Sequence, residues 1–161
     1  MNKFNHFIGI DISKKVFDAT ILLESNETMH SEFQNSKEGV KEFVKWTKSL
    51  GAKAQSTLVC MEHTGIYKNI LVKQLFKKKY NVWVEMPLCI IKSSGIQKGK
   101  NDKIDSERIA KYAKRFEDKA TLYKGNNIVL DKIQALLKQR EMFMTQKKAI
   151  HTRAQEQMSY D

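Results

Sequence analysis

The chain has few cysteines, whose disulfides stabilise small secreted domains, and it lacks the long apolar runs of membrane-spanning helices. It has two cysteines, Cys60 and Cys89, which lie far apart and form no CxxC pair, so disulfide and zinc frameworks are not indicated. Cys60 falls within an apolar stretch, which predicts a buried free thiol in a reducing compartment. No apolar run approaches the roughly 20 residues of a membrane-spanning helix, and the N-terminal MNKFNHFIGI carries no cleavage pattern. We therefore expect a cytoplasmic protein with no membrane partner.

Acidic residues and phosphate-binding glycine loops are also scarce. Aspartate and glutamate number 18 against 29 lysines and arginines, a net charge of +11, and no Gly-rich loop of the Walker type occurs. The basic excess is concentrated in three stripes: five lysines and no acid at 68–79, eight basic residues and three acids at 92–115, and six and one at 132–153. Such stripes either bind phosphates, with an affinity that falls as salt rises, or form solvated helix faces.

Proline and glycine are absent from the C-terminal part of the chain. Between Ile128 and Asp161 neither occurs, and apolar residues recur every seven positions, at Val129, Leu136, Phe143 and Ile150. Ile133 and Ala154 lie on the intervening seam, which Arg140 and Lys147 interrupt. The pattern predicts a long helix with partial coiled-coil character that pairs with another helix or subunit. No C-cap signal closes this helix, so we expect the chain to be cut from a longer protein.

The preceding part of the chain predicts an α/β domain. Five short runs rich in β-branched and apolar residues predict strands, at 7–12, 16–23, 29–34, 57–62 and 81–86. Turn residues join the first three into an antiparallel meander, whereas a helix between the fourth and fifth predicts a right-handed parallel crossover. Ser36 predicts the N-cap of one helix, which ends at Gly51, and Thr64 predicts that of the next. With a basic linker at 93–101 and a helix at 103–116, the prediction is a mixed five-stranded sheet flanked by helices.

Four acids stand where such a domain can gather them. Asp11 ends the first predicted strand and Glu62 the fourth, while Asp102 and Asp105 lie three residues apart at the start of a predicted helix. In phosphodiester chemistry, two Mg²⁺ ions about 4 Å apart activate an oxygen nucleophile and stabilise a leaving oxygen, and several carboxylates must hold them. We therefore predict a catalytic site for Mg²⁺, or for Mn²⁺ in its place, formed by Asp11, Glu62, Asp102 and Asp105.

Each acid also has a purely structural explanation. Asp11 could be an exposed strand-end acid that opens a turn. Glu62 could be an ordinary acid at the junction between a strand and a helix. Asp102 and Asp105 have the spacing of a capping arrangement, with Asp102 at the N-cap position. Asp18, on the second predicted strand, is expected to face solvent.

Basic side chains flank the predicted acids. Helix capping does not need basic side chains nearby, whereas binding to phosphate does. We predict that six of these side chains contact the backbone of a nucleic acid: Lys14, Lys15, Lys98, Lys100, Lys103 and Arg108.

Three strings of this sequence resemble the N-terminal DEDD domain of insertion sequence 110 family transposases, which are related to Piv-type DNA invertases: GIDISKKVFD, MEHTGIY and KNDKIDSERIAKYA, in that order. The resemblance covers nearly the whole chain. It implies an α/β fold of the RNase H-like, RuvC-like kind, with a catalytic domain at 1–120 and a long helix at 126–161 for oligomerisation or for linkage to a further domain. It also implies that the family's four Mg²⁺-binding acids correspond to Asp11, Glu62, Asp102 and Asp105.

By the same resemblance, the chain works with partners that it does not contain. Family members carry a C-terminal domain that supplies a catalytic serine, and they form multimers, expected here to be a dimer or a tetramer, that a structured noncoding RNA guides. None of Ser13, Ser93, Ser94 and Ser106 matches the serine motif. We thus expect a prokaryotic DNA transposase or site-specific recombinase that cleaves and exchanges DNA strands. The alternatives are a Mg²⁺-dependent nuclease that resolves Holliday junctions and a non-catalytic module that binds nucleic acid.

Overall fold

The computed structural model describes residues 4–63, 65–94, 101–125 and 128–158. These residues divide into two compact units, Met1–Lys124 and Gly125–Asp161. Each unit is described by itself below. Among the helices in these parts of the chain, none combines the length and the hydropathy that crossing a bilayer requires.

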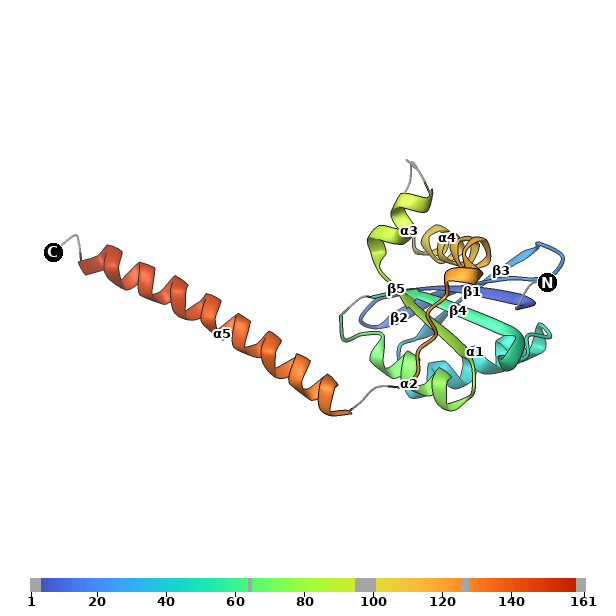
Figure 1. Ribbon diagram of the computed structural model, residues 1–161, viewed down its shortest axis with the longest axis horizontal. Helices are drawn as coiled ribbons and strands as arrows, with labels where there is room; N and C mark the ends of the chain where they lie inside the picture. Colours follow the sequence, from blue (N-terminus) through green and yellow to red (C-terminus); the bar gives the residue numbers. More distant parts are fainter. Residues whose placement is uncertain (1–3, 64, 95–100, 126–127, 159–161) are drawn as a thin grey trace. The chain divides into compact units, whose positions relative to one another are not determined.

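The first unit is built on a five-stranded mixed sheet with the strand order β3-β2-β1-β4-β5 (Figure 1). The strands are β1 (His6–Ile12), β2 (Val16–Leu22), β3 (Thr28–Gln34), β4 (Thr57–Glu62) and β5 (Asn81–Glu85). β1, β2 and β3 pair antiparallel, whereas β4 pairs parallel with β1 and with β5. The predicted mixed sheet is confirmed, and it is consistent with the RNase H-like fold that the resemblance implies.

Helices cover both faces of this sheet (Figure 1). On one face, α1 (Lys37–Ser49) and α2 (Asn69–Lys77) pack on the even-numbered residues of β1 and the odd-numbered residues of β2 and β4. On the other face, α3 (Pro87–Ser94) and α4 (Asp102–Arg115) enclose a second apolar cluster that contains Phe7, Leu58 and Trp83. Since strand residues alternate between faces, the two clusters together bury both sides of β1 and β4.

The predicted start of α1 is confirmed. Ser36 has an extended backbone, and its Oγ accepts a hydrogen bond from the Gly39 N–H at 3.1 Å, which satisfies one of the unpaired donors of the first turn. The helix reaches Ser49, and Gly51 follows with φ +77, in the left-handed region that glycine adopts without a Cβ penalty.

Two other helix starts differ from the prediction. α2 begins at Asn69, and the expected cap residue Thr64 lies outside the described residues. α3 was not predicted, because Pro87 directly follows the fifth predicted strand, at 81–86, and proline is also common where a strand ends. Proline also suits the first turn of a helix, where no N–H is needed, and α3 begins there. The predicted linker therefore starts within a helix, and its residues 95–100 lie outside the described parts of the chain.

The second unit contains the helix α5 (Ile128–Met158), 31 residues long. The predicted long helix is therefore confirmed. Leu136, Phe143 and Ile150, which belong to the heptad pattern, are all exposed. Their pairing with a second helix or subunit stays a prediction.

Phe43 should be costly to truncate in the core beneath α1. It is fully buried, and its ring centroid lies 5.6 Å from that of Phe33 and 5.8 Å from that of Phe17. We expect Phe43→Ala to lower the free energy of unfolding by about 3–5 kcal/mol, because the cavity cannot refill. Urea unfolding measures this. The control is Phe76→Ala, since Phe76 is 40% exposed on α2; an equal loss in both variants would contradict the prediction.

Candidate functional site

The site depends on how closely α4 approaches the sheet. A Cβ atom at Gly9 would lie 2.1 Å from both the backbone N of Ala110 and the carbonyl O of Ser106, so no larger residue fits beneath the helix. Ser106 is also hydrogen-bonded across this contact, to Thr20 of β2 at 2.7 Å. The N-terminal half of α4 is thereby held directly against β1 and β2.

Pleat alternation places the strand acids on the face that α4 covers. Ile10 and Ile12 of β1 belong to the core beneath α1 and α2, so Asp11 points to the opposite face, as Gly9 does. In β4, Cys60 belongs to the cluster beneath α4, and Glu62 shares its face. The two predicted strand acids therefore face the helix that carries the other two.

Electrostatics shows that the four predicted acids share one neighbourhood. The pKa of Asp11 is raised from 3.8 to about 6, first by burial and then by the negative charges of Asp102, Asp105 and Glu62. A hydrogen bond from the Ile12 backbone lowers it in part. Such mutual repulsion requires carboxylates that lie near one another, since charge interactions fade with distance and with solvent screening. Residues from β1, β4 and α4 thus meet at one end of the sheet.

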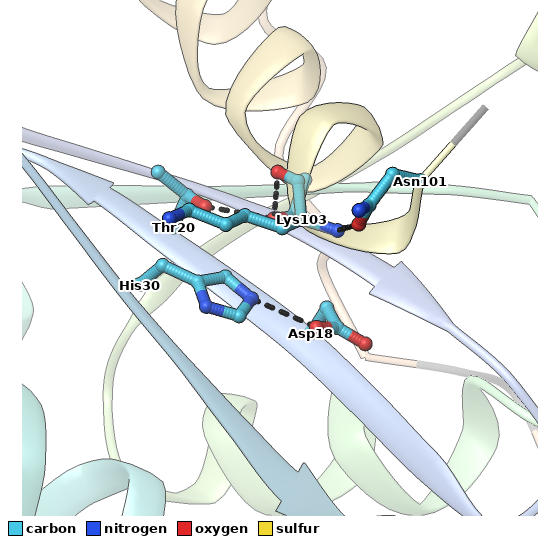
Figure 2. A network of polar contacts seen from close by, with 6 residues as sticks. Asp18, Thr20, His30, Asn101 and Lys103 are labelled. Carbon is cyan, nitrogen blue, oxygen red and sulfur yellow. Dashed lines mark hydrogen bonds and ion pairs between the residues drawn. The ribbon is translucent and has the colours of Figure 1, made fainter. Parts of the chain in front are cut away.

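The cap of α4 differs from the prediction, and the difference matters for Asp102. The N-cap residue is Asn101, whose Oδ1 accepts a hydrogen bond from the Lys103 N–H at 3.0 Å (Figure 2). Asp102 is the first residue of the helix and its side chain is exposed. The alternative explanation, in which Asp102 caps the helix, is therefore excluded. Asparagine and aspartate cap helices about equally well, and here Asn101 takes that position.

Asp105 is held by an arginine one turn further along α4. Arg108 Nη1 donates to Asp105 Oδ1 at 2.7 Å, and each side chain is only about one-fifth exposed, at 20% and 19%. This i, i+3 pair orients the Asp105 carboxylate and offsets part of its charge. Arg108 was predicted to contact nucleic acid. Because it pairs with Asp105, part of its hydrogen-bond donor capacity is already used within the helix.

The carboxylates are near one another but are not yet arranged as ligands. Among the described residues, no three His, Cys, Asp or Glu side chains converge closely enough to hold a metal ion. The donor set nevertheless has the right chemistry, because a group of carboxylate oxygens suits Mg²⁺ or Mn²⁺ rather than a soft metal. The raised pKa of Asp11 records a repulsion that a cation would relieve. By the chemistry of their donor atoms these residues fit such an ion, although the described side chains do not converge on one point.

Asp18 is a polar residue of this face whose burial the sequence analysis missed. It was expected to face solvent, but it is 7% exposed and its Cα is the register partner of Asp11. His30 Nε2 lies 2.7 Å from Asp18 Oδ1, which gives the buried carboxylate a partner (Figure 2). The short predicted hairpin after Asp11 was the available signal, because it sets Asp11 opposite Asp18.

Glu85 is a second acid that was missed. It ends β5 as the register partner of Glu62, so both carboxylates stand at the same edge of the sheet. Its Oε2 accepts from the Tyr112 hydroxyl at 3.2 Å, and its Oε1 accepts from the Met86 N–H at 2.7 Å. Burial, and then the nearby Glu85 charge, raise the pKa of Tyr112 well above its usual range. Glu85 thus ties α4 to the edge strand.

The other predicted residues are placed as follows. Lys14, Lys15 and Lys103 are exposed, whereas Lys98 and Lys100 lie outside the described residues. Cys60 is a buried free thiol, as predicted. Its pKa is raised far above the usual range, by burial and then by the charges of Glu85 and Glu62.

Comparison with known proteins gives the class and then the family. A family model described as a transposase matches residues 8–159. The chain belongs to the DEDD transposases of the insertion sequence 110 family. It is similar to the pilin gene-inverting proteins of Moraxella bovis and Moraxella lacunata, with 32% identity to each over 138 residues. Those matches take in 84% of this chain and 42% of each relative, so the chain spans less than half of their length.

Without divalent cations, ionised Asp11 should destabilise the fold. Its pKa is about 6 in the folded state and 3.8 as a free group, so its contribution is fully favourable below pH 3.8 and is lost as pH rises through 6. We expect Asp11→Asn to be more stable than the natural chain at pH 8 by on the order of 2 kcal/mol, allowing for solvent screening. The gap should close as the pH falls to 4.

Urea unfolding in a metal chelator, at pH 4 and at pH 8, measures this difference. The control is Glu42→Gln, which removes an exposed acid of α1 on the other face of the sheet. It should change stability little at either pH. If the Asp11→Asn chain is less stable than the natural one at pH 8, ionised Asp11 does not destabilise the fold and the prediction is wrong.

Proposed function

We propose that this chain is the metal-binding part of a DNA transposase or site-specific recombinase that takes part in DNA strand cleavage and exchange. The observation that carries the proposal is the shared neighbourhood of Asp11, Glu62, Asp102 and Asp105, seen in the raised pKa of Asp11. Four carboxylates from three separate elements, with the exposed Lys14, Lys15 and Lys103 next to them in the chain, suit an enzyme that handles phosphodiesters. Membership of a transposase family supports the same conclusion.

In this proposal the four acids hold Mg²⁺, or Mn²⁺ in its place. When bound, the metal supplies positive charge to the phosphate and to the oxygens that enter and leave. Asp11 must lose its proton to serve, which it does above a pH of about 6. Arg108, whose Nη1 lies 2.7 Å from Asp105 Oδ1, would orient the Asp105 carboxylate. Lys14 and Lys15, exposed in the turn that follows Asp11, contact the DNA backbone.

Strand exchange rather than simple hydrolysis is favoured by the relatives. The similar Moraxella proteins are named for inverting a pilin gene, which is a rearrangement of DNA. The remaining length of such relatives leaves room for the domain that carries a catalytic serine in this family. We propose that the whole protein also uses a structured guide RNA and assembles as a homo-oligomer. The exposed apolar side chains of α5, such as Leu136 and Ile150, support the last point.

Metal binding should depend on acids that are far apart in sequence. We expect Asp11→Ala and Asp105→Ala each to weaken Mn²⁺ binding at least about tenfold, because each removes a ligand from one shared site. Calorimetric titration with Mn²⁺ and with Mg²⁺, with and without a four-way DNA junction, measures this. The control is Glu42→Ala, an exposed acid on the other face. If both site variants bind Mn²⁺ as the natural chain does, the chain is a non-catalytic binding module.

The chain by itself should bind DNA without exchanging strands. Its exposed lysines can neutralise phosphates, so binding should weaken steeply between 50 and 200 mM salt, by roughly tenfold or more. A strand-transfer assay with the same DNA should show no product, because the proposed nucleophile belongs to a domain outside this chain. Efficient strand transfer by this chain would contradict the proposal. Metal-dependent hydrolysis of a four-way junction would instead support a resolving nuclease.

A further inference from the structure

Two of the contacts that hold α4 on the sheet lie side by side. Gly9 of β1 leaves the space in which the backbone of α4 sits, since a Cβ there would come 2.1 Å from Ser106 O. Thr20 of β2 is the register partner of Gly9, and its Oγ1 lies 2.7 Å from Ser106 Oγ (Figure 2). The turn of α4 that contains Ser106 therefore contacts the register pair Gly9 and Thr20.

The hydrogen bond in this contact is directional. The Ser106 hydroxyl donates its one proton to the Lys103 carbonyl O at 2.9 Å, so Thr20 is the donor to Ser106. Both residues are almost wholly buried, Thr20 at 1% and Ser106 at 0% exposure. A buried pair of this kind holds its partners in one arrangement, because leaving either hydroxyl unpaired there costs free energy.

The predicted metal acids stand immediately beyond this contact on both elements. On β1, Asp11 follows Gly9 by two residues and shares its face. On α4, Asp105 directly precedes Ser106, and Asp102 lies one turn earlier. A shift of α4 at Ser106 would therefore change the distance between Asp11 and the helix acids Asp102 and Asp105. Mg²⁺ tolerates little such change, because its ligands must lie at about 2.1 Å in near-octahedral geometry.

We infer that Gly9, Thr20 and Ser106 are positioning residues, which set the spacing between Asp11 and the acids of α4 without touching the metal. The inference rests on the proposed metal-binding function and adds three residues to it. These residues act through the placement of α4. Supporting residues of this kind typically change metal affinity by about 10–100-fold when they are replaced.

The chain offers a matched control for the Thr20–Ser106 bond. On the other face of the sheet, Thr47 of α1 and Tyr80 form a second buried hydroxyl pair, also at 2.7 Å. Thr47 donates to the Val44 carbonyl O at 3.1 Å, so Tyr80 is the donor to Thr47. Thr20→Val and Tyr80→Phe each delete the donor of one such bond and preserve most of the side-chain shape. They differ in which helix they loosen.

The experiment compares these two variants by Mn²⁺ titration calorimetry and by urea unfolding. We expect both to lose some stability, but only Thr20→Val to weaken Mn²⁺ binding, by about tenfold. Thr20→Ser, which keeps the donor, should bind Mn²⁺ as the natural chain does. Ser106→Ala added to Thr20→Val should weaken binding little further, because both changes remove the same bond.

Asp11→Ala separates failure of this inference from failure of the proposed function. If Asp11→Ala weakens Mn²⁺ binding and Thr20→Val does not, the positioning role is wrong while the metal site stands. If Thr20→Val and Tyr80→Phe weaken binding equally, the effect is one of general stability, and the inference is again wrong. If Asp11→Ala leaves Mn²⁺ binding unchanged, both the proposed function and the inference fall.

Discussion

The close contact between the backbone of α4 and β1 at Gly9 is the constraint on which the rest of the site depends. Glycine removes the side chain that would separate helix from strand, and a Cβ there would come 2.1 Å from α4 backbone atoms. The apolar side chains of Ile109 and Ala113 then join the cluster that includes Phe7 and Trp83. Because α4 is seated this closely, the acids of its first turns come into the neighbourhood of Asp11.

This arrangement gathers negative charge at one end of a sheet whose interior is otherwise apolar. Buried like charges oppose folding, and the raised pKa of Asp11 expresses that cost. Each of three acids near this end has a hydrogen-bonding partner: Arg108 pairs with Asp105, His30 Nε2 lies 2.7 Å from Asp18 Oδ1, and the Tyr112 hydroxyl donates to Glu85. Stability comes mainly from the apolar layers, including the aromatic group around Phe43 beneath α1. The apolar layers thus carry a site whose acidic residues repel one another.

Much of the architecture could be predicted from local patterns, and the errors have specific causes. Strands were found because β-branched runs are separated by turn residues, and Ser36 was found because a cap and its helix lie within a few residues. The cap of α4 was misplaced by one residue, since Asn101 and Asp102 are both good caps. α3 was missed because Pro87 suits the end of a strand and the start of a helix alike. Asp18 was misjudged because the burial of its face depends on a helix far along the chain.

The sequence by itself determined the strands, the helices other than α3, and the alternation that sets Asp11 and Asp18 on one face. These features follow from residues that are close in the chain, so local propensity and pleat geometry suffice. Only the tertiary structure decided that α4 covers this face, with Ser106 bonded to Thr20 across 86 positions of the chain. The shared neighbourhood of the four acids was decided in the same way. Such contacts depend on packing between distant elements, which no local pattern encodes.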